Sequence, residues 1–449
     1  MAVSSHSNTY VVEQDKAPED KLNIVYWLVV LVGFGVLLPW NMFITISPEY
    51  YVNYWFKQNG EETWYSKEFM GSLTIASQLP NATINVFNLF LILAGPLIYR
   101  VFVPVCFNIF NLSVILILVV LLEPTLEWMK PFFWITLGIA TSINFSNGLY
   151  ENSVYGVFAD FPHTYIGALL IGNNICGLLI TFVKIGVTYC TFLVEMSRVT
   201  CSFSVLNDMP RLVAIVYFSI SLGILLVCAI ALYFITKQDF YHYYHQKGMQ
   251  VREKAETDKP SPSILWMTFR NCFGQLFNVW FCFAVTLTIF PVMMTVITRG
   301  KYGFLDKIIS ENNEIYTLLT SFLVFNLFAT IGSIVASKIH WPTPRYLFVA
   351  IVARAFFIPV FFFCNYRVET RAYPVLFDST DIFVVAGILM SFSHGYLSAL
   401  AMGYTPNVVP SHYSRFAAQL SVCTLMVGLL TGGLWAVLIE NMVDKPQIF

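Results

Sequence analysis

Residues 148–177 read GLYENSVYGVFADFPHTYIGALLIGNNICG, a polar stretch set between two long apolar runs. The runs, near 133–158 and 165–193, are each long enough to cross the roughly 30 Å hydrocarbon core of a bilayer as a helix. Glu151 lies within the first run, at a depth where a charge costs roughly 2.5–3.5 kcal/mol on insertion scales. Such a residue usually faces a cavity and a partner, so the stretch predicts two membrane helices beside a polar site.

The composition of the whole chain agrees with membrane helices. It is 57% hydrophobic and 11% charged, whereas a soluble domain carries about a quarter charged residues. Its apolar runs are continuous rather than alternating, and backbone groups in lipid have to be paired, so the runs predict helices and not a β-barrel. The net charge of −1 argues against a nucleic-acid partner.

Eleven runs have the length of a spanning helix, which predicts an all-α polytopic membrane protein with 11 transmembrane helices. They lie near 24–46, 70–94, 99–122, 133–158, 165–193, 211–235, 277–298, 316–337, 345–365, 380–404 and 415–439. The longest polar break in mid-chain divides them six and five, and its lysines favour a cytoplasmic position. We therefore expect a tail over 1–23, a six-helix half over 24–235, a linker over 236–263 and a five-helix half over 264–449.

Polar residues recur at helical spacing on five of the expected helices, so each set shares one face. The sets are Gln78, Asn81, Asn85 and Asn88; Asn144, Asn147, Glu151 and Tyr155; Asn174, Gly177, Thr181, Lys184 and Thr188; Asn326, Thr330, Ser333 and Ser337; and Ser391, His394 and Ser398. For one set alone we favour structural hydrogen bonds between helices, worth around 1 kcal/mol per contact. Five sets from both halves instead favour a shared aqueous pathway, which is typical of a transporter.

Three ionisable residues lie deep in apolar runs: Glu151, Lys184 and Arg354. A carboxylate and a cation could pair there, which would lower the cost of burial without any functional role. The sequence leaves open whether Glu151 forms such an ion pair or contacts a substrate. We expect Lys184 and Arg354 to stabilise the bundle or its gates, and His394 to bond between helices or to carry protons.

Several function classes lack their signature in this chain. There is no phosphate loop of the Gly-x-x-x-x-Gly-Lys-[Ser/Thr] kind, so nothing indicates ATP as a driving force. Neither His-Glu-x-x-His nor Gly-x-Ser-x-Gly occurs, which argues against an intramembrane hydrolase. We expect no enzyme activity, no cofactor and no metal site.

Short motifs recur in order along nearly the whole chain. They are Leu37-Leu38-Pro39-Trp40-Asn41, Leu79-Pro80-Asn81, Gly156 with Phe161-Pro162, Tyr165, Gly172 and Gly177, Phe290-Pro291, Phe325-Asn326 with Gly332, Arg354 with Pro359 and Asn365, and Phe392-Ser393-His394-Gly395-Tyr396-Leu397. In this combination the chain resembles the equilibrative nucleoside transporter family. The last motif departs by one residue, because His394 takes the place of the usual Asn.

The resemblance implies a six-plus-five arrangement like the major facilitator fold, a cytoplasmic N-terminus and alternating-access transport. The family's substrates are nucleosides, and in some members nucleobases or organic cations. We therefore expect a small-molecule substrate, the lipid bilayer as surroundings, and a monomer. Because residues 1–23 hold no acidic-dileucine sorting signal, we expect the plasma membrane.

The resemblance also implies positions for the site. The substrate-binding residues it implies are Leu37, Trp40, Gln78, Asn81, Glu151 and Asn326, and the outer gate would include Phe290 and Pro291. Glu151 falls where many nucleoside carriers have Gln, which hydrogen-bonds the base. The Asp and Arg that hold ribose hydroxyls in the family fall on Ala329 and Ser333, so we expect poor discrimination between sugars.

The leading hypothesis is a passive carrier that binds a nucleoside between its halves, with the base stacked on Trp40. An organic cation or a free nucleobase is the alternative substrate, since Glu151 replaces Gln and the ribose-binding pair is absent. Proton coupling through Glu151 is a further hypothesis. A membrane sensor that binds ligand without moving it is ranked lower, because the polar faces run through both halves.

Overall fold

The computed structural model describes residues 17–58, 61–90, 98–196, 209–254, 261–305, 313–368 and 371–443 of the chain. Most of the expected tail, residues 1–16, lies outside the described part. The described chain is almost entirely helical, as the sequence predicts. Two short strands, β1 (Lys57–Gln58) and β2 (Glu61–Glu62), pair antiparallel with Lys57 opposite Glu62.

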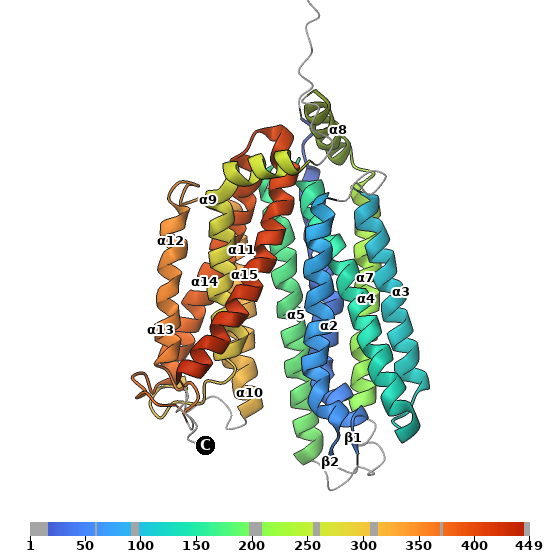
Figure 1. The fold of residues 1–449 in the computed structure, drawn as a ribbon, viewed down its shortest axis with the longest axis vertical. Helices are drawn as coiled ribbons and strands as arrows, with labels where there is room; N and C mark the ends of the chain where they lie inside the picture. Colours follow the sequence, from blue (N-terminus) through green and yellow to red (C-terminus); the bar gives the residue numbers. More distant parts are fainter. Residues whose placement is uncertain are drawn as a thin grey trace, which may run out of the picture.

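The described residues of the first half form a bundle that contains six long helices (Figure 1). They are α1 (Ile24–Ser47), α2 (Trp64–Phe90), α3 (Tyr99–Leu121), α4 (Leu126–Phe158), α5 (His163–Met196) and α7 (Met209–Ile235). A 3₁₀ turn (Lys21–Asn23) precedes α1 and a π-helical turn (Pro48–Trp55) extends it. The carboxylate of Asp20 accepts hydrogen bonds from the backbone N–H groups of Val25 and Tyr26, at 2.9 and 3.0 Å, and so satisfies donors that the start of a helix leaves unpaired.

The second half lies beside the first and contains more interrupted helices (Figure 1). Its helices are α9 (Pro262–Leu287), α10 (Asn313–Thr317), α11 (Val324–Lys338), α12 (Leu347–Ala353), α13 (Phe357–Phe362), α14 (Thr380–Tyr404) and α15 (Ser414–Val443). Short turns join them: Thr288–Met293 after α9, Leu318–Leu323 before α11, Arg354–Phe356 between α12 and α13, and Thr405–Asn407 with Ser411–Tyr413 before α15. α9 begins at Pro262, where the hydroxyl of Ser261 caps the N–H of Ile264 at 3.2 Å.

The connection between the halves is itself largely helical. α8 (Asp239–Lys254) lies within the expected linker 236–263, at the end of the molecule where α4 turns into α5 (Figure 1). Gly248 packs there directly on the carboxylate of Asp160, so a side chain at position 248 would overlap it. Arg252 donates to both oxygens of Asp160 at 2.7 and 2.9 Å, and these two side chains are 3% and 6% exposed.

Eight segments of the described chain are long and apolar enough to cross a membrane, and a shorter apolar segment covers Leu347–Phe362. The prediction of a polytopic helical fold is therefore confirmed. The largest difference from the expected boundaries is at the helix expected at 277–298, which begins at Pro262 and loses helical geometry at Phe290. The helices expected at 70–94 and 133–158 also begin earlier, at Trp64 and Leu126. The polar first turns of α9 hide this start from a search for apolar runs.

Glycines allow the helices to approach closely, as is common where packing rather than hydrophobic burial joins membrane helices. Gly172 on α5 lies against the backbone of Val30 and Phe34 on α1, where a Cβ would overlap. Gly395 on α14 lies in the same way on Ala329 of α11. Both glycines belong to the motifs singled out in the sequence, so these motifs mark helix crossings.

Candidate functional site

The two halves meet where α5 crosses α11. The amide of Asn326 on α11 donates to the hydroxyl of Thr181 on α5 at 2.9 Å. Gly177 faces the same amide, and a Cβ there would overlap its oxygen. Asn174, further along α5, donates to the hydroxyl of Ser333 at 2.5 Å. Asn326 is thus a polar group at the junction of the halves, as a substrate-contacting residue would have to be.

A second polar junction joins α2 and α4 to α15. The amide of Asn152, which is fully buried, accepts from Asn88 at 2.8 Å and donates to the carbonyl of Gln419 at 3.3 Å. The thiol of Cys423 donates to the carbonyl of Asn85 at 3.3 Å. These contacts cross between the first and second halves, so both junctions involve residues that would separate if the halves moved apart.

Glu151 immediately precedes Asn152 on α4 and is 3% exposed. Within the described residues its carboxylate makes no hydrogen bond and no ion pair, and it lies within electrostatic reach of Tyr155 and Cys423. A buried carboxylate without a cation is costly, because the charge loses its hydration and gains nothing in return. Glu151 is therefore a group whose partner would come from a ligand, a water molecule or a proton.

Among the described residues, Glu151 does not form the ion pair that the sequence left open. Lys184 pairs with Glu49 in the π-helical turn Pro48–Trp55. The described hydrogen bonds of Arg354 go to uncharged groups on α9 and α14. The sequence did not indicate the pair of Lys184 with Glu49, because Glu49 lies in a polar stretch that a search for apolar runs assigns to a loop.

The other residues expected at the site are spread over α1 and α2. Leu37 and Trp40 on α1 are half-buried against the hydrophobic core, and Gln78 on α2 is exposed. Asn81 accepts from Asn85 at 2.7 Å and lies against Gly148, one turn before Glu151. No hydrogen bond in the described chain joins any of these residues to Asn326, so their shared role in binding stays a prediction.

The expected gate residue Phe290 lies where α9 loses its helical geometry, with φ −112° and ψ 131°. Its ring stacks on Phe325 of α11, with centroids 3.8 Å apart and planes 10° apart. Phe325 in turn stacks on His394 of α14 at 5.5 Å and 25°. The stacked rings of Phe290, Phe325 and His394 therefore connect the turn after α9 with α11 and α14. Pro291, the other expected gate residue, directly follows Phe290 in the chain.

The polar faces predicted from the sequence divide into two kinds. Most hydroxyls bond to the carbonyl one turn earlier in their own helix, as Thr181, Thr330 and Ser391 do. Side-chain amides do both: Asn147 accepts from Asn108 of another helix at 2.7 Å, whereas Asn144 bonds to the carbonyl of Ala140 in its own helix. Hydroxyl spacing alone therefore does not mark a pathway, whereas the amides at Asn152, Asn174 and Asn326 mark the junctions of the halves.

Ala329 and Ser333, which fall where the family has an Asp and an Arg, are both fully buried. Ser333 is fully buried, accepts from Asn174 and donates to carbonyls of Ala329 and Gly395. Ala329 lies directly on Gly395. A longer side chain at either position would have to displace these contacts, so the two small residues fit together with the close crossing of α11 and α14.

Some contacts between elements were not predicted from the sequence. The hydroxyl of Tyr404 donates to the carbonyls of His340 and Pro342, at 3.0 and 3.3 Å. His163 at the start of α5 faces His340 edge-on, with ring centroids 4.4 Å apart. These residues close the same end of the molecule that holds α8. Single polar residues at helix ends give no periodic signal, which is why the sequence did not indicate them.

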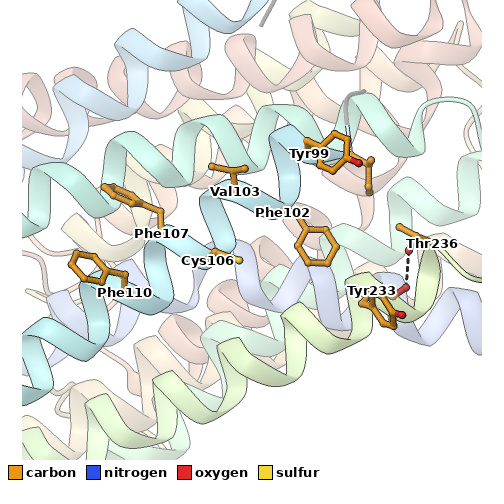
Figure 2. Close-up of a pocket in the computed structure, with 9 residues that line it drawn as sticks. Tyr99, Phe102, Val103, Cys106, Phe107, Phe110, Tyr233 and Thr236 are labelled. Atoms are coloured by element: carbon orange, nitrogen blue, oxygen red, sulfur yellow. Dashed lines mark hydrogen bonds between the residues drawn. The ribbon is translucent and has the colours of Figure 1, made fainter. Parts of the chain in front are cut away.

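One groove in the described structure lies away from these junctions. It has a volume of about 790 Å³ and lies between α3 and α7, where Phe102, Phe107, Phe110 and Tyr233 line it (Figure 2). Several lining side chains are more than half exposed, and none is a residue expected at the site. The groove therefore lies on the outer surface of the bundle.

Comparison with known proteins gives the family. A family profile described as nucleoside transporter matches residues 137–441. The chain belongs to the nucleoside transporter family. Equilibrative nucleoside transporter 3 of Rattus norvegicus is 27% identical, over 95% of this chain and 90% of its own length. Equilibrative nucleoside transporter 1 of Homo sapiens is 25% identical, over 95% of this chain and 99% of its own length.

Solved structures support the fold of this nucleoside transporter family member. The proton:xylose symporter XylE, a major facilitator superfamily protein, aligns with a TM-score of 0.58 over 94% of this chain and 90% of that chain, at 11% identity. The symporter FucP in its outward conformation aligns with a TM-score of 0.54 over 93% and 96%, also at 11% identity. The major-facilitator-like fold implied by the resemblance is confirmed, and the family consists of transporters rather than enzymes.

Proposed function

We propose that this protein moves nucleosides across a membrane by facilitated diffusion. The observation that carries the proposal is the family match over 137–441, together with relatives named as equilibrative nucleoside transporters that align over nearly their whole length. The two polar junctions between the halves support it, because a carrier needs polar groups that open and close around a hydrophilic substrate.

The proposal includes an arrangement in the membrane. Eleven spans form a six-helix half over 24–235 and a five-helix half over 264–449, joined by the linker 236–263 with its helix α8. The N-terminal tail and the linker lie in the cytoplasm, and the protein works as a monomer in the plasma membrane. The halves rock against each other in alternating access, with the substrate held between them.

The proposed site follows the same arrangement. The base packs on Leu37 and Trp40 of α1, and Gln78, Asn81, Glu151 and Asn326 supply polar contacts. Phe290 and Pro291 form part of the outer gate. Asn326 supports this role through its place at the junction of α5 and α11.

Uptake of labelled uridine and adenosine by expressing cells tests the proposal. Trp40→Ala should lower uptake, because the loss of a stacking ring removes about 1–3 kcal/mol of base binding, which corresponds to roughly five- to a hundredfold in affinity. Trp27→Ala is the matched control, since Trp27 lies on the same helix and is 59% exposed. Uptake equal to that of non-expressing cells for every nucleoside would contradict the proposal.

A second candidate is transport of organic cations or free nucleobases. The observation that favours it is the buried carboxylate of Glu151, which has no cation partner among the described residues. A cationic substrate would supply that partner. A panel that compares organic cations with neutral nucleosides, at acidic and neutral external pH, separates this candidate from the first and tests proton coupling.

A further inference from the structure

Arg354 is a buried cation of the second half, and the partners that the described residues give it are all uncharged. It is 2% exposed and lies at the 3₁₀ turn (Arg354–Phe356) between α12 and α13. Its guanidinium donates to the carbonyl of Cys282 at 2.8 Å, to the hydroxyl of Ser393 at 3.1 Å and to the hydroxyl of Thr286 at 2.7 Å. No carboxylate contacts it in the described chain. Its position is therefore set by hydrogen bonds to α9 and α14.

The hydroxyl of Thr286 connects Arg354 to His394. This hydroxyl accepts from Arg354, donates to the carbonyl of Cys282 at 2.8 Å, and lies 2.9 Å from Nδ1 of His394. The hydroxyl of Thr286 and Nδ1 of His394 share a hydrogen bond, and the tautomer of the ring decides which of the two atoms donates. With either donor, this bond holds the plane of the imidazole ring.

The fixed ring of His394 supports the gate. Phe283 meets it edge-on at 5.2 Å and 88°, and Phe325 stacks on it at 5.5 Å and 25°. The ring of Phe325 also stacks on the ring of Phe290, with centroids 3.8 Å apart, at the point where the chain after α9 leaves helical geometry. Backbone hydrogen bonds of a regular helix do not hold Phe290 at that break, so its orientation depends on the two rings that contact it, Phe325 and, edge-on at 5.5 Å, Phe322.

We infer that Arg354, Thr286 and His394 form a positioning network that sets the gate aromatics Phe325 and Phe290 from behind. None of the three has to touch the substrate. The network lies within the second half, so it is carried as a unit when the halves move. The inference rests on the proposed transport function. It adds a role for Thr286, which the sequence did not single out, and for Arg354 and His394, which the sequence placed only as packing or coupling groups.

The experiment compares Thr286→Val with Thr286→Ser, which keeps the hydroxyl. Thr268→Val is the matched control, because Thr268 is also buried on α9 and its hydroxyl bonds only to the carbonyl of Ile264. Purified variants are compared in two measurements, equilibrium binding of a nucleoside and the maximal rate of uptake in proteoliposomes. Thr286→Val should lower the maximal rate by about tenfold and change binding by less than about threefold, because a gate acts on movement more than on occupancy.

Thr286→Ser and Thr268→Val should both keep the wild-type rate within about twofold. His394→Phe provides a second variant, since it keeps a ring for Phe325 and removes the bond to Thr286; its rate should also fall with binding retained. A wild-type rate in both Thr286→Val and His394→Phe would overturn the inference. Equal losses in Thr286→Val and Thr268→Val would overturn it too. If the wild-type protein neither binds nor moves any nucleoside, the proposed function fails instead.

Discussion

Glu151 is the residue at which substrate choice is most open to test. It is buried at the polar junction of α4 and α15 and has no ion-pair partner among the described residues. If a cationic substrate supplies the partner, Glu151→Gln should lower cation uptake by at least about thirtyfold, because a buried charge pair is worth about 2–5 kcal/mol. Neutral nucleoside uptake should change little, since Gln can still hydrogen-bond a base.

Competing uptake of labelled cation and labelled uridine in one cell line measures this difference. Glu123→Gln is the control for a change of charge, because the side chain of Glu123 is 73% exposed and pairs with Arg211. Equal losses of cation and nucleoside uptake in Glu151→Gln would contradict a charge-specific role. They would indicate that the carboxylate is needed for the structure of the junction.

At the scale of elements, the crossing of α5 and α11 sets how closely the halves approach. Gly177→Ala should disturb it, because the added methyl group would overlap the amide oxygen of Asn326. We expect a loss of uptake of about tenfold or more, since overpacking of about 1–3 kcal/mol falls on the contact that must close in each cycle. Gly186→Ala is the matched control: it lies on the same helix and a Cβ there meets nothing within 4 Å. Wild-type uptake by Gly177→Ala at equal surface expression would refute this account of the crossing.

Outside the spanning helices, α8 is an element whose docking we expect to depend on pH. Burial lowers the pKa of His245, which stacks on Tyr241 at 5.4 Å. The nearby charges oppose one another: Asp160 raises this pKa, and Arg252, Arg415 and His242 lower it. Because the pKa of His245 is lower in the docked helix than in the undocked helix, the undocked helix binds more protons. Docking of α8 is therefore complete above about pH 6.5 and weakens as the pH falls below that value.

Hydrogen exchange of the α8 amides, corrected for the intrinsic effect of pH, measures this docking. Protection should fall between about pH 7.5 and about pH 5.5 in the wild type and stay constant in His245→Gln, which cannot take up the proton. Protection that is equal at both values in the wild type would contradict the assignment. Loss of protection at both values in His245→Gln would also contradict it.

Sequence reasoning predicted the helices and the family well because both depend on local pattern. The length of an apolar run predicts a helix. Glycine–proline motifs predict where two helices cross closely, and Gly172 and Gly395 lie at such crossings. It predicted side-chain partners poorly, because these depend on which helices become neighbours. Lys184 pairs with Glu49 rather than Glu151, and Arg354 bonds to uncharged groups on two other helices.

The whole molecule consists of two helical halves that meet at polar junctions. α5 contacts α11 at one junction and α4 contacts α15 at the other, while α8 lies at one end (Figure 1). Both junctions consist of a few side-chain amides with hydroxyl or carbonyl partners, each contact worth around 1 kcal/mol. Contacts of this strength suit surfaces that separate and rejoin, and the charged pairs Lys184–Glu49 and Arg252–Asp160 lie outside them.

Equilibrative transport is tested by following a labelled nucleoside into proteoliposomes that contain the purified protein and no ion gradient. We expect saturable entry that stops when the internal and external concentrations are equal, and faster exchange when unlabelled nucleoside is present inside. Entry no faster than in protein-free liposomes would contradict transport. Accumulation above the external concentration once a proton gradient is imposed would contradict the equilibrative mechanism.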